Sequence, residues 1–232
     1  MKRLIIACLL FLPVMNACFS AEWQKLHEEA DKISGSQAKS LAEKSPMASS
    51  DLYIYGLVNL NIRNDKTAKE IFLKIKDLDV SFYEADWGLA EVLRRGHKIE
   101  ESESMLLDLI KRHPDFAPPY LSLAYIRYNQ MKFEESVRLA HKVTAMGEKN
   151  LDLSNYVRAY LIIAGAKGMI AHYGGPLSKA INGTQVLPIL KKVQNIRPES
   201  PELLFGLGSF YLLAPKLAGG DLNSAGEYLK KT

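Results

Sequence analysis

The sequence has only two cysteines in 232 residues, Cys8 and Cys18, and both lie near its start. If the first twenty residues are an export signal, Cys8 leaves with that signal and Cys18 is either lost or acylated. The mature chain then has no thiol for a disulfide, a thiolate metal site or a nucleophile. Its stability must come from packing alone.

A strong excess of charge of one sign is also missing. The net charge is +4, and Lys2 and Arg3 contribute two of those charges. Basic residues elsewhere form only short pairs, Arg94-Arg95 and Lys191-Lys192, whereas a nucleic-acid binder usually shows a basic stripe or cluster. We interpret these pairs as solvated helix faces and expect no nucleic-acid partner.

The motifs of metal and catalytic sites are absent from the sequence. None of the five histidines has another at the helical spacings that metal sites use. Gly206-Leu207-Gly208-Ser209 fails the spacing of a nucleophile elbow, and Gly165-Ala166-Lys167-Gly168 lacks the spacing of a phosphate loop. We interpret both stretches as places of close helix packing, and we expect no metal, no cofactor and no enzymatic activity.

No apolar run is long enough to cross a membrane, but one short run has another meaning. Lys2 and Arg3 precede the apolar stretch from Leu4 to Val14. A short apolar core behind basic residues is typical of a secretory signal peptide, and a membrane span needs about 20 apolar residues. We therefore predict a signal peptide over residues 1–20 and an exported protein. The competing interpretation is a buried first helix.

The cleavage site has two interpretations. Met15-Asn16-Ala17-Cys18 resembles a bacterial lipobox, in which the cysteine becomes the lipidated first residue, although Met15 and Asn16 are unusual there. The alternative is ordinary cleavage near Ser20. The protein is accordingly expected to be periplasmic, or anchored to a bacterial membrane only through a lipid on Cys18.

The strongest feature is a sequence repeat with a period of about 34 residues, found between about 49 and 150. Small residues, and large apolar residues beside them, recur at this spacing without gaps. Two small residues let a pair of antiparallel helices approach closely, and one pair cannot bury its apolar face unless neighbouring pairs stack on it. The recurring positions are Gly56, Ala90 and Ala124; Ala68, Ser102 and Ser136; Phe72, Leu106 and Ala140; and Ile75, Leu109 and Val143.

In period and in these columns the sequence resembles the tetratricopeptide repeat (TPR) family. The resemblance implies an all-α fold, a right-handed superhelical solenoid of antiparallel helix pairs. Turns are expected at Asn64-Asp65, Gly96-His97 and Gln130-Met131. The whole of residues 21–232 is expected to form one such domain.

The flanks of the regular repeats predict less regular helix pairs. Residues 151–232 are expected to hold irregular repeats with Gly-rich insertions. Asp221 is placed to cap the last helix. The expected segments are helices over Trp23–Ile33 and Gln37–Lys44, a long helix over Asp152–Tyr173, an insertion over 174–183, a helix over Thr184–Ile196 and a final unit from Pro201.

The final unit carries a second resemblance. Ala214-Pro215 and Gly219-Gly220-Asp221, followed by Ala225, are similar to a segment of TatT-like proteins, bacterial envelope lipoproteins associated with TRAP solute transporters. The resemblance implies an alternative function, an accessory of solute uptake in which the Gly-rich insertions shape a pocket for a small solute. The sequence stops directly after the last helix, which suggests either self-association or truncation.

In TPR proteins the first helix of each pair lines a concave groove, and the resemblance therefore implies a binding surface. Aromatic and arginine side chains make strong contacts when buried at an interface. The residues do not match the Lys/Asn carboxylate clamp of chaperone-binding TPR domains. Our leading hypothesis is a protein-binding adaptor in the cell envelope, whose partner is a protein or peptide segment, or an envelope transporter component. An alternative interpretation of Trp87 and Tyr125 is that these side chains pack between repeats and do not contact a partner. The candidate groove residues are Tyr53, Trp87, Glu91, Arg94, Tyr125 and Tyr128.

Overall fold

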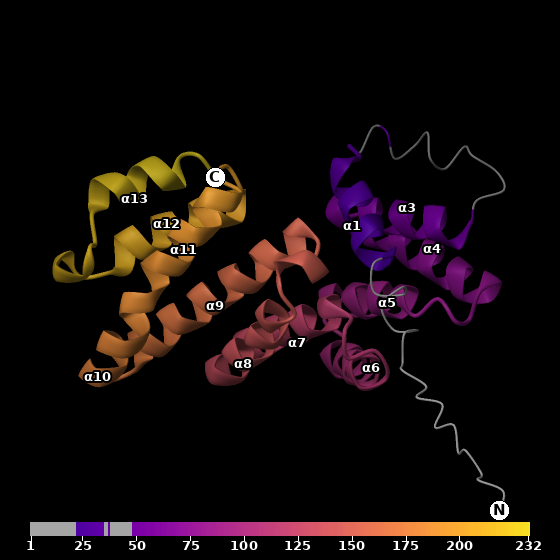
Figure 1. Cartoon of the computed structure of the whole chain (residues 1–232), viewed down its shortest axis with the longest axis horizontal. Helices are drawn as coiled ribbons and strands as arrows, with labels where there is room; N and C mark the ends of the chain where they lie inside the picture. Colours follow the sequence, from indigo (N-terminus) through magenta and orange to yellow (C-terminus); the bar gives the residue numbers. More distant parts are fainter. Residues whose placement is uncertain (1–21, 35–36, 38–47) are drawn as a thin grey trace, which may run out of the picture.

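The computed structural model describes residues 22–34, 37 and 48–232, and every regular element among them is helical (Figure 1). The predicted signal peptide, Cys18 and residues 38–44 of an expected helix lie outside these described residues. The first described helix, α1 (Glu22–Lys32), confirms the helix expected over Trp23–Ile33.

Six helices form the three regular repeats, and consecutive helices pack against each other in pairs. This arrangement confirms the all-α solenoid predicted from the period of the repeat. The first helices of the pairs also contact one another from repeat to repeat. The pairs are α3 (Ser49–Asn61) with α4 (Asp65–Leu78), α5 (Glu84–Arg95) with α6 (Ile99–Arg112), and α7 (Ala117–Asn129) with α8 (Phe133–Ala145).

The small residues of the repeat let large side chains enter between helices. The ring of Phe72 is fully buried between Gly56 on α3 and Gly88 on α5. A Cβ atom added at either glycine would lie 2.5 Å from a carbon of that ring. In the next repeat the hydroxyl of Ser102 donates a hydrogen bond of 2.8 Å to the carbonyl oxygen of Ala90. The helices therefore approach closely at both sets of recurring small residues, the set that contains Gly56 and Ala90 and the set that contains Ser102, as predicted.

The turns inside the repeats share one backbone geometry that the sequence did not reveal. Arg63, His97 and Met131 have positive φ angles of 63°, 60° and 61°, and they occupy the same position in each repeat. In each turn the next amide donates to the carbonyl oxygen five residues earlier, as in a Schellman motif. In the first repeat the turn covers 62–64, so Asp65 already begins α4 instead of forming the turn.

The second half of the chain contains longer and less regular elements. Residues 174–183, which were expected as an insertion, are largely helical and lead directly into the helix that starts at Thr184. A new helical turn starts at Pro176. The Ser178 hydroxyl in this turn donates a hydrogen bond of 3.0 Å to the carbonyl oxygen of Ile170. No helix of the described residues is long and apolar enough to cross a membrane. The elements are η1 (Glu148–Asn150), α9 (Leu153–Tyr173), α10 (Pro176–Ser178), η2 (Lys179–Gly183), α11 (Thr184–Ile196), α12 (Pro201–Leu213), η3 (Lys216–Ala218) and α13 (Leu222–Leu229).

Two of these helices, α9 and α13, are capped at their N-termini by the side chain of an aspartate. The Asp221 side chain accepts hydrogen bonds from the backbone amides of Asn223 and Ser224, which confirms its predicted capping role. Asp152 caps α9 in the same way through the amide of Asn155. Both helices therefore begin where the sequence indicated.

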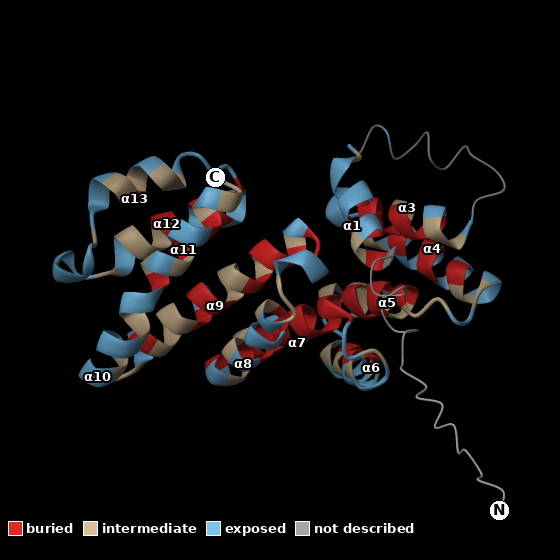
Figure 2. Ribbon diagram, viewed as in Figure 1, coloured by how far each residue is buried: buried red, intermediate tan, exposed pale blue. Residues whose placement is uncertain are grey.

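The buried residues form a continuous core from α1 to the first half of α9, and a second core under α9, α11 and α12 (Figure 2). In Figure 1 the helices follow a curve, and α1 lies on α3 near the start of α9. We use the term inner wall for the side of α3, α5, α7 and α9 that α1 covers at one end.

Candidate functional site

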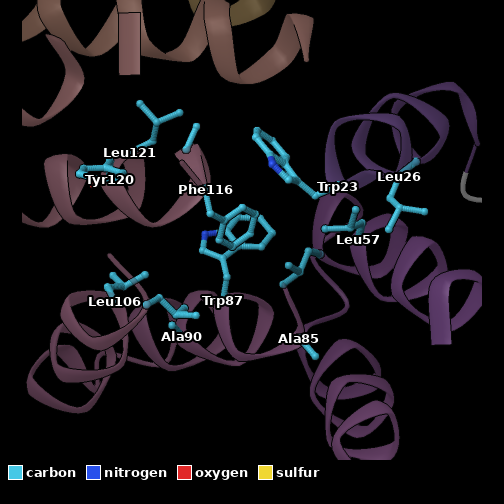
Figure 3. Packing of buried hydrophobic residues seen from close by; sticks show 14 of the residues in the cluster. Trp23, Leu26, Leu57, Ala85, Trp87, Ala90, Leu106, Phe116, Tyr120 and Leu121 are labelled. Carbon is cyan, nitrogen blue, oxygen red and sulfur yellow. The ribbon is translucent and has the colours of Figure 1, made fainter. Parts of the chain in front are cut away.

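Helix α1 packs across the inner wall through an aromatic cluster. The indole of Trp23 is 1% exposed, and its ring centroid lies 5.3 Å from that of Phe116, edge to face. His27, one turn further along α1, lies 5.2 Å from Trp87 of α5, centroid to centroid. Figure 3 shows Trp23 pointing from α1 towards Phe116 and Trp87. The first described helix therefore covers one end of the inner wall.

Two of the predicted groove residues lie beneath this helix. Tyr53 is fully buried, and its hydroxyl shares a hydrogen bond of 3.1 Å with Nε2 of His27. Trp87 is also buried, and its indole nitrogen donates to the hydroxyl of Ser122 on α7 at 3.0 Å. Trp87 thus packs between repeats, and neither side chain is accessible to a partner while α1 is in place.

Next to Trp87, the predicted residues Glu91 and Arg94 form a two-pronged ion pair on α5. Nε of Arg94 donates to Oε1 of Glu91 at 3.1 Å, and Nη2 donates to Oε2 at 2.9 Å. Burial raises the pKa of Glu91, but the hydrogen bonds from Arg94 and the charges of Arg158 and Arg94 outweigh it and bring the pKa to about 2. Glu91 is therefore a buried, ionised carboxylate at neutral pH.

The two predicted tyrosines of α7 extend the same surface. Tyr125 is 41% exposed, and the guanidinium carbon of Arg94 lies 4.7 Å from its ring centroid, a cation–π contact. Tyr128 is half-buried, with its ring 5.4 Å from that of Phe133, and a Cβ atom at Gly165 of α9 would lie 3.6 Å from it. The structure therefore brings Glu91, Arg94 and Tyr125 together, and Tyr128 faces α9 one turn away.

Sequence reasoning missed Arg158 on α9. This side chain is half-buried, and its charge acts on Glu91 and Arg94 of α5. Burial lowers the pKa of Arg158, and the nearby carboxylate of Glu91 raises it. Arg158 lies 34 residues, one repeat period, after Ala124. A strict repeat alignment therefore assigns Arg158 to the position of the recurring small residues and not to the binding surface.

A polar cluster joins α1 to the start of α9. Burial, with the charge of Arg158, lowers the pKa of His27 to about 3, so the imidazole is neutral. The side-chain amide of Asn155 donates to the carboxylate of Asp152 at 2.6 Å and lies 3.5 Å from Nδ1 of His27. Burial raises the pKa of Asp152 to about 6 against the hydrogen bonds from Asn155. In the part of the chain that the structure describes, no three His, Cys, Asp or Glu side chains converge as metal ligands.

No protein-family model and no curated protein sequence matches this chain. Solved structures do match. Yeast Tom70 superposes with a TM-score of 0.57 and 16% identity over 89% of this chain and 46% of that chain, so this chain spans less than half of it. A MamA double mutant (RS-1 ArsTM) gives a TM-score of 0.49 at 11% identity, over 79% of this chain and 91% of that one. YrrB, described as a TPR protein with an unusual peptide-binding site, gives a TM-score of 0.45 at 13% identity, over 84% of this chain and 89% of that one.

The likeness to Tom70 concerns the fold alone. Together with the consecutive helix pairs described above, it shows that this chain has an all-helical solenoid fold, as predicted from the repeat.

Proposed function

We propose that this chain is a protein-binding adaptor or scaffold without catalytic activity, and that its partner lies on the part of the inner wall that α1 leaves open. A helical solenoid offers an extended surface suited to a polypeptide. The observation that supports this location most directly is Tyr125, an exposed aromatic side chain held over Arg94. Rigid aromatic and arginine side chains are the residue types that contribute most at interfaces.

Helix α1 supports the proposal from another direction. It is a short amphipathic helix whose apolar side chains lie on the inner wall, and its charged residues Lys25, Glu28 and Glu29 are exposed. The inner wall therefore already holds one helical segment by its apolar face. A partner segment bound beside it would use the same mode, a helix in a groove.

The partner can be sought by site-specific photocrosslinking. A photoreactive amino acid would replace Tyr125 in one variant and Leu107, an exposed residue of α6, in a control variant. The proposal expects one protein to crosslink in native cells at position 125 and not at position 107. Equal products at both positions, or none at position 125, would contradict it.

We further propose that the protein acts in the cell envelope, as the predicted signal peptide over residues 1–20 suggests. A lipid on Cys18 would place it at a membrane, and ordinary cleavage near Ser20 would leave it periplasmic. Replacing Cys18→Ala separates the two. A shift from the membrane to the soluble fraction, with loss of the acyl mass, supports the anchor, whereas unchanged fractionation and mass exclude it.

A further inference from the structure

We propose that the connection between α9 and α11 is a membrane-contacting tip, and that it places apolar side chains in the surface of a bilayer that carries anionic lipids. The sequence predicted membrane contact only through a lipid on Cys18, and the tip is separate from such a lipid. The inference goes beyond the adaptor function and does not depend on it, because it concerns one end of the solenoid and not the inner wall.

The connection between α9 and α11 carries exposed apolar side chains. Tyr173 ends α9, Leu177 lies in α10 and Ile181 lies in η2, and each of the three is more than half exposed. We call these three residues the tip patch. In Figure 1, α10 lies at the end of the molecule opposite α4, and Figure 2 shows its surface exposed. Exposed apolar groups of this kind mark contact with another protein or with a membrane.

Contacts with neighbouring helices hold the tip patch in place. The ring of Tyr173 stacks on that of Phe133 on α8, with centroids 6.1 Å apart and planes at 10°. The Ser178 hydroxyl ties α10 to α9 through the carbonyl oxygen of Ile170, at 3.0 Å. Binding costs less conformational entropy when the contacting segment is already ordered. The tip is therefore prepared for a contact with something outside the chain.

The charge of the helices behind the patch favours an anionic lipid surface over a protein. Residues 153–198 contain no aspartate and no glutamate, although the net charge of the whole chain is only +4. Lys179 lies within the tip, between Leu177 and Ile181, and is exposed. An anionic lipid surface attracts basic side chains that come close to it. The basic residues of this segment are Arg158, Lys167, Lys179, Lys191, Lys192 and Arg197.

The lysine of the tip has no carboxylate partner among the described residues. Every salt bridge in that part of the chain joins side chains between Asp65 and Arg138, before α9 begins. The other side chains of the tip suit a membrane surface. Tyrosine is typical of the level of the lipid headgroups, and aliphatic side chains reach the acyl boundary below them.

The small size of the tip patch supports the same choice. A stable protein–protein interface involves about 20–30 residues on each side, whereas the tip patch has three apolar side chains at the end of a helix pair. Binding to a membrane surface instead combines buried apolar area with attraction to anionic lipids. A few apolar side chains beside a lysine are enough to contribute to it.

The connection between α12 and α13 extends this surface. Helix α12 packs on α9, and in Figure 1 this connection lies at the same end of the molecule as α10. Leu217 in the connection is fully exposed, and Lys216 beside it is also exposed. The acid of the connection, Asp221, accepts hydrogen bonds from backbone amides of α13. This end of the solenoid therefore presents exposed apolar side chains and a lysine at two places.

The first test measures whether the tip enters a bilayer. One variant carries Leu177→Cys and a control variant carries Val80→Cys, at an exposed residue between α4 and α5; both also carry Cys8→Ser and Cys18→Ser. The single cysteine is labelled with a dye whose emission moves to shorter wavelengths in apolar surroundings. Each protein is mixed with vesicles of equal parts phosphatidylglycerol and phosphatidylcholine, or of phosphatidylcholine alone.

We expect a shift at position 177 with the phosphatidylglycerol vesicles, a smaller shift or none with phosphatidylcholine alone, and no shift at position 80. Because the dye reports on its own position, a tether elsewhere in the chain does not produce this pattern. Equal shifts at the two positions, equal shifts with the two kinds of vesicle, or no shift at position 177 would overturn the inference. A shift at position 177 without vesicles that grows with protein concentration would assign the tip to a second copy, and would also overturn it.

The second test removes the charge of the tip. Lys179→Gln should weaken sedimentation with phosphatidylglycerol vesicles by about fivefold, and the effect should shrink at high salt. Lys74→Gln, at an exposed lysine of α4, loses the same charge elsewhere and should change binding by less than about twofold. Equal losses in the two variants would show that binding follows net charge, against the inference. Photocrosslinking at position 125 does not involve the tip, so the adaptor function stands or fails separately.

Discussion

The imidazole Nε2 of His27 on α1 lies 3.1 Å from the phenol oxygen of Tyr53 on α3, and both side chains are buried. This contact places the chain's first described helix on a residue that the TPR pattern assigns to the binding groove. The inner wall is therefore divided: α1 covers one end, and Tyr125 on the remaining part is exposed. The division leads to predictions for α1 itself.

Replacing Trp23→Ala should release α1 from the inner wall. The indole is almost completely buried and packs edge to face on Phe116 and His27, and removing a buried aromatic side chain costs about 3–5 kcal/mol. Because α1 is held by this face, we expect local undocking before global unfolding. Hydrogen exchange should show loss of protection at α1 amides, while amides of α7 and α8 stay protected.

A matched control for this variant is Lys25→Ala, because Lys25 lies exposed on the opposite face of α1. It should leave the exchange pattern unchanged. Uniform loss of protection in Trp23→Ala, across all repeats, would mean that α1 is an inseparable part of the core and not a docked segment.

His27 should make an unfavourable contribution to the stability of wild type when the pH falls from about 7.5 to about 5.5. Its pKa is about 3 in the folded chain, against an ordinary value of 6.5, so the unfolded chain binds a proton that the folded chain excludes. The stabilisation is complete above pH 6.5 and is lost as pH falls towards 3. The contribution of His27 to the free energy of unfolding should drop by about 1.4 kcal/mol per pH unit between pH 6.5 and about 3.

The comparison that isolates this effect is His27→Gln, which stays neutral and keeps a polar group near Tyr53. Urea unfolding of both proteins at the two pH values gives the difference. Asp152, whose raised pKa acts in the opposite direction, is present in both proteins and cancels. Parallel pH profiles for wild type and variant would contradict a buried neutral His27.

Much of the fold was predictable because it follows from local, periodic signals. The columns at Gly56, Ala68 and Phe72 specify close helix pairs, and their repetition specifies stacking. The helix expected over Thr184–Ile196 has these limits in the structure. The left-handed residues Arg63, His97 and Met131 escaped prediction because none is glycine, the residue that usually marks such a conformation.

The candidate site was less predictable, because it depends on contacts between distant segments. The amphipathic pattern of α1 shows that one face must be buried, but not that this face lies on Tyr53 and Trp87. Arg158 escaped because α9 departs from the regular repeat period. Glu91 and Arg94 were found because they lie within a regular repeat, where the pattern assigns each position to a face.

Arg127 should contribute more to stability than an exposed ion pair of the same chain. It is buried on α7, donates to Glu103 of the preceding repeat at 2.8 Å, and pairs with Glu135 of α8 at 3.0 Å. Its replacement by methionine keeps the packing of the stem but removes the ion pairs with Glu103 and Glu135, and Glu135 then keeps only Arg138, at 3.7 Å. We expect a loss of about 1–3 kcal/mol in urea unfolding, because the carboxylates are only partly buried.

The control variant for Arg127→Met is Lys98→Met. It removes the ion pair between Lys98 and Glu101, whose side chains are both 59% exposed. That change should alter the free energy of unfolding by less than about 0.5 kcal/mol. Similar effects of the two substitutions would show that the pairs between repeats act only as surface charges.

The most direct test of the repeat packing is an alanine at Gly56 or Gly88. Each new methyl group would lie 2.5 Å from the Phe72 ring, and the opposite glycine helix prevents the ring from moving away. Overpacking of this kind costs about 1–3 kcal/mol, despite the better helix propensity of alanine. Thermal unfolding should show a lower melting temperature for both variants.

Gly226→Ala on α13 is the matched control, since no atom lies within 4 Å of the added Cβ. Because the added methyl group meets no other atom, Gly226→Ala should raise the free energy of unfolding by up to about 1 kcal/mol, the gain in helix propensity. Combining Gly56→Ala with Phe72→Leu separates the cause further, because the smaller side chain vacates the space that the methyl group needs. The double variant should therefore be less destabilised than the sum of the two single variants. Additive losses would show that the glycine is required by the backbone and not by the Phe72 ring.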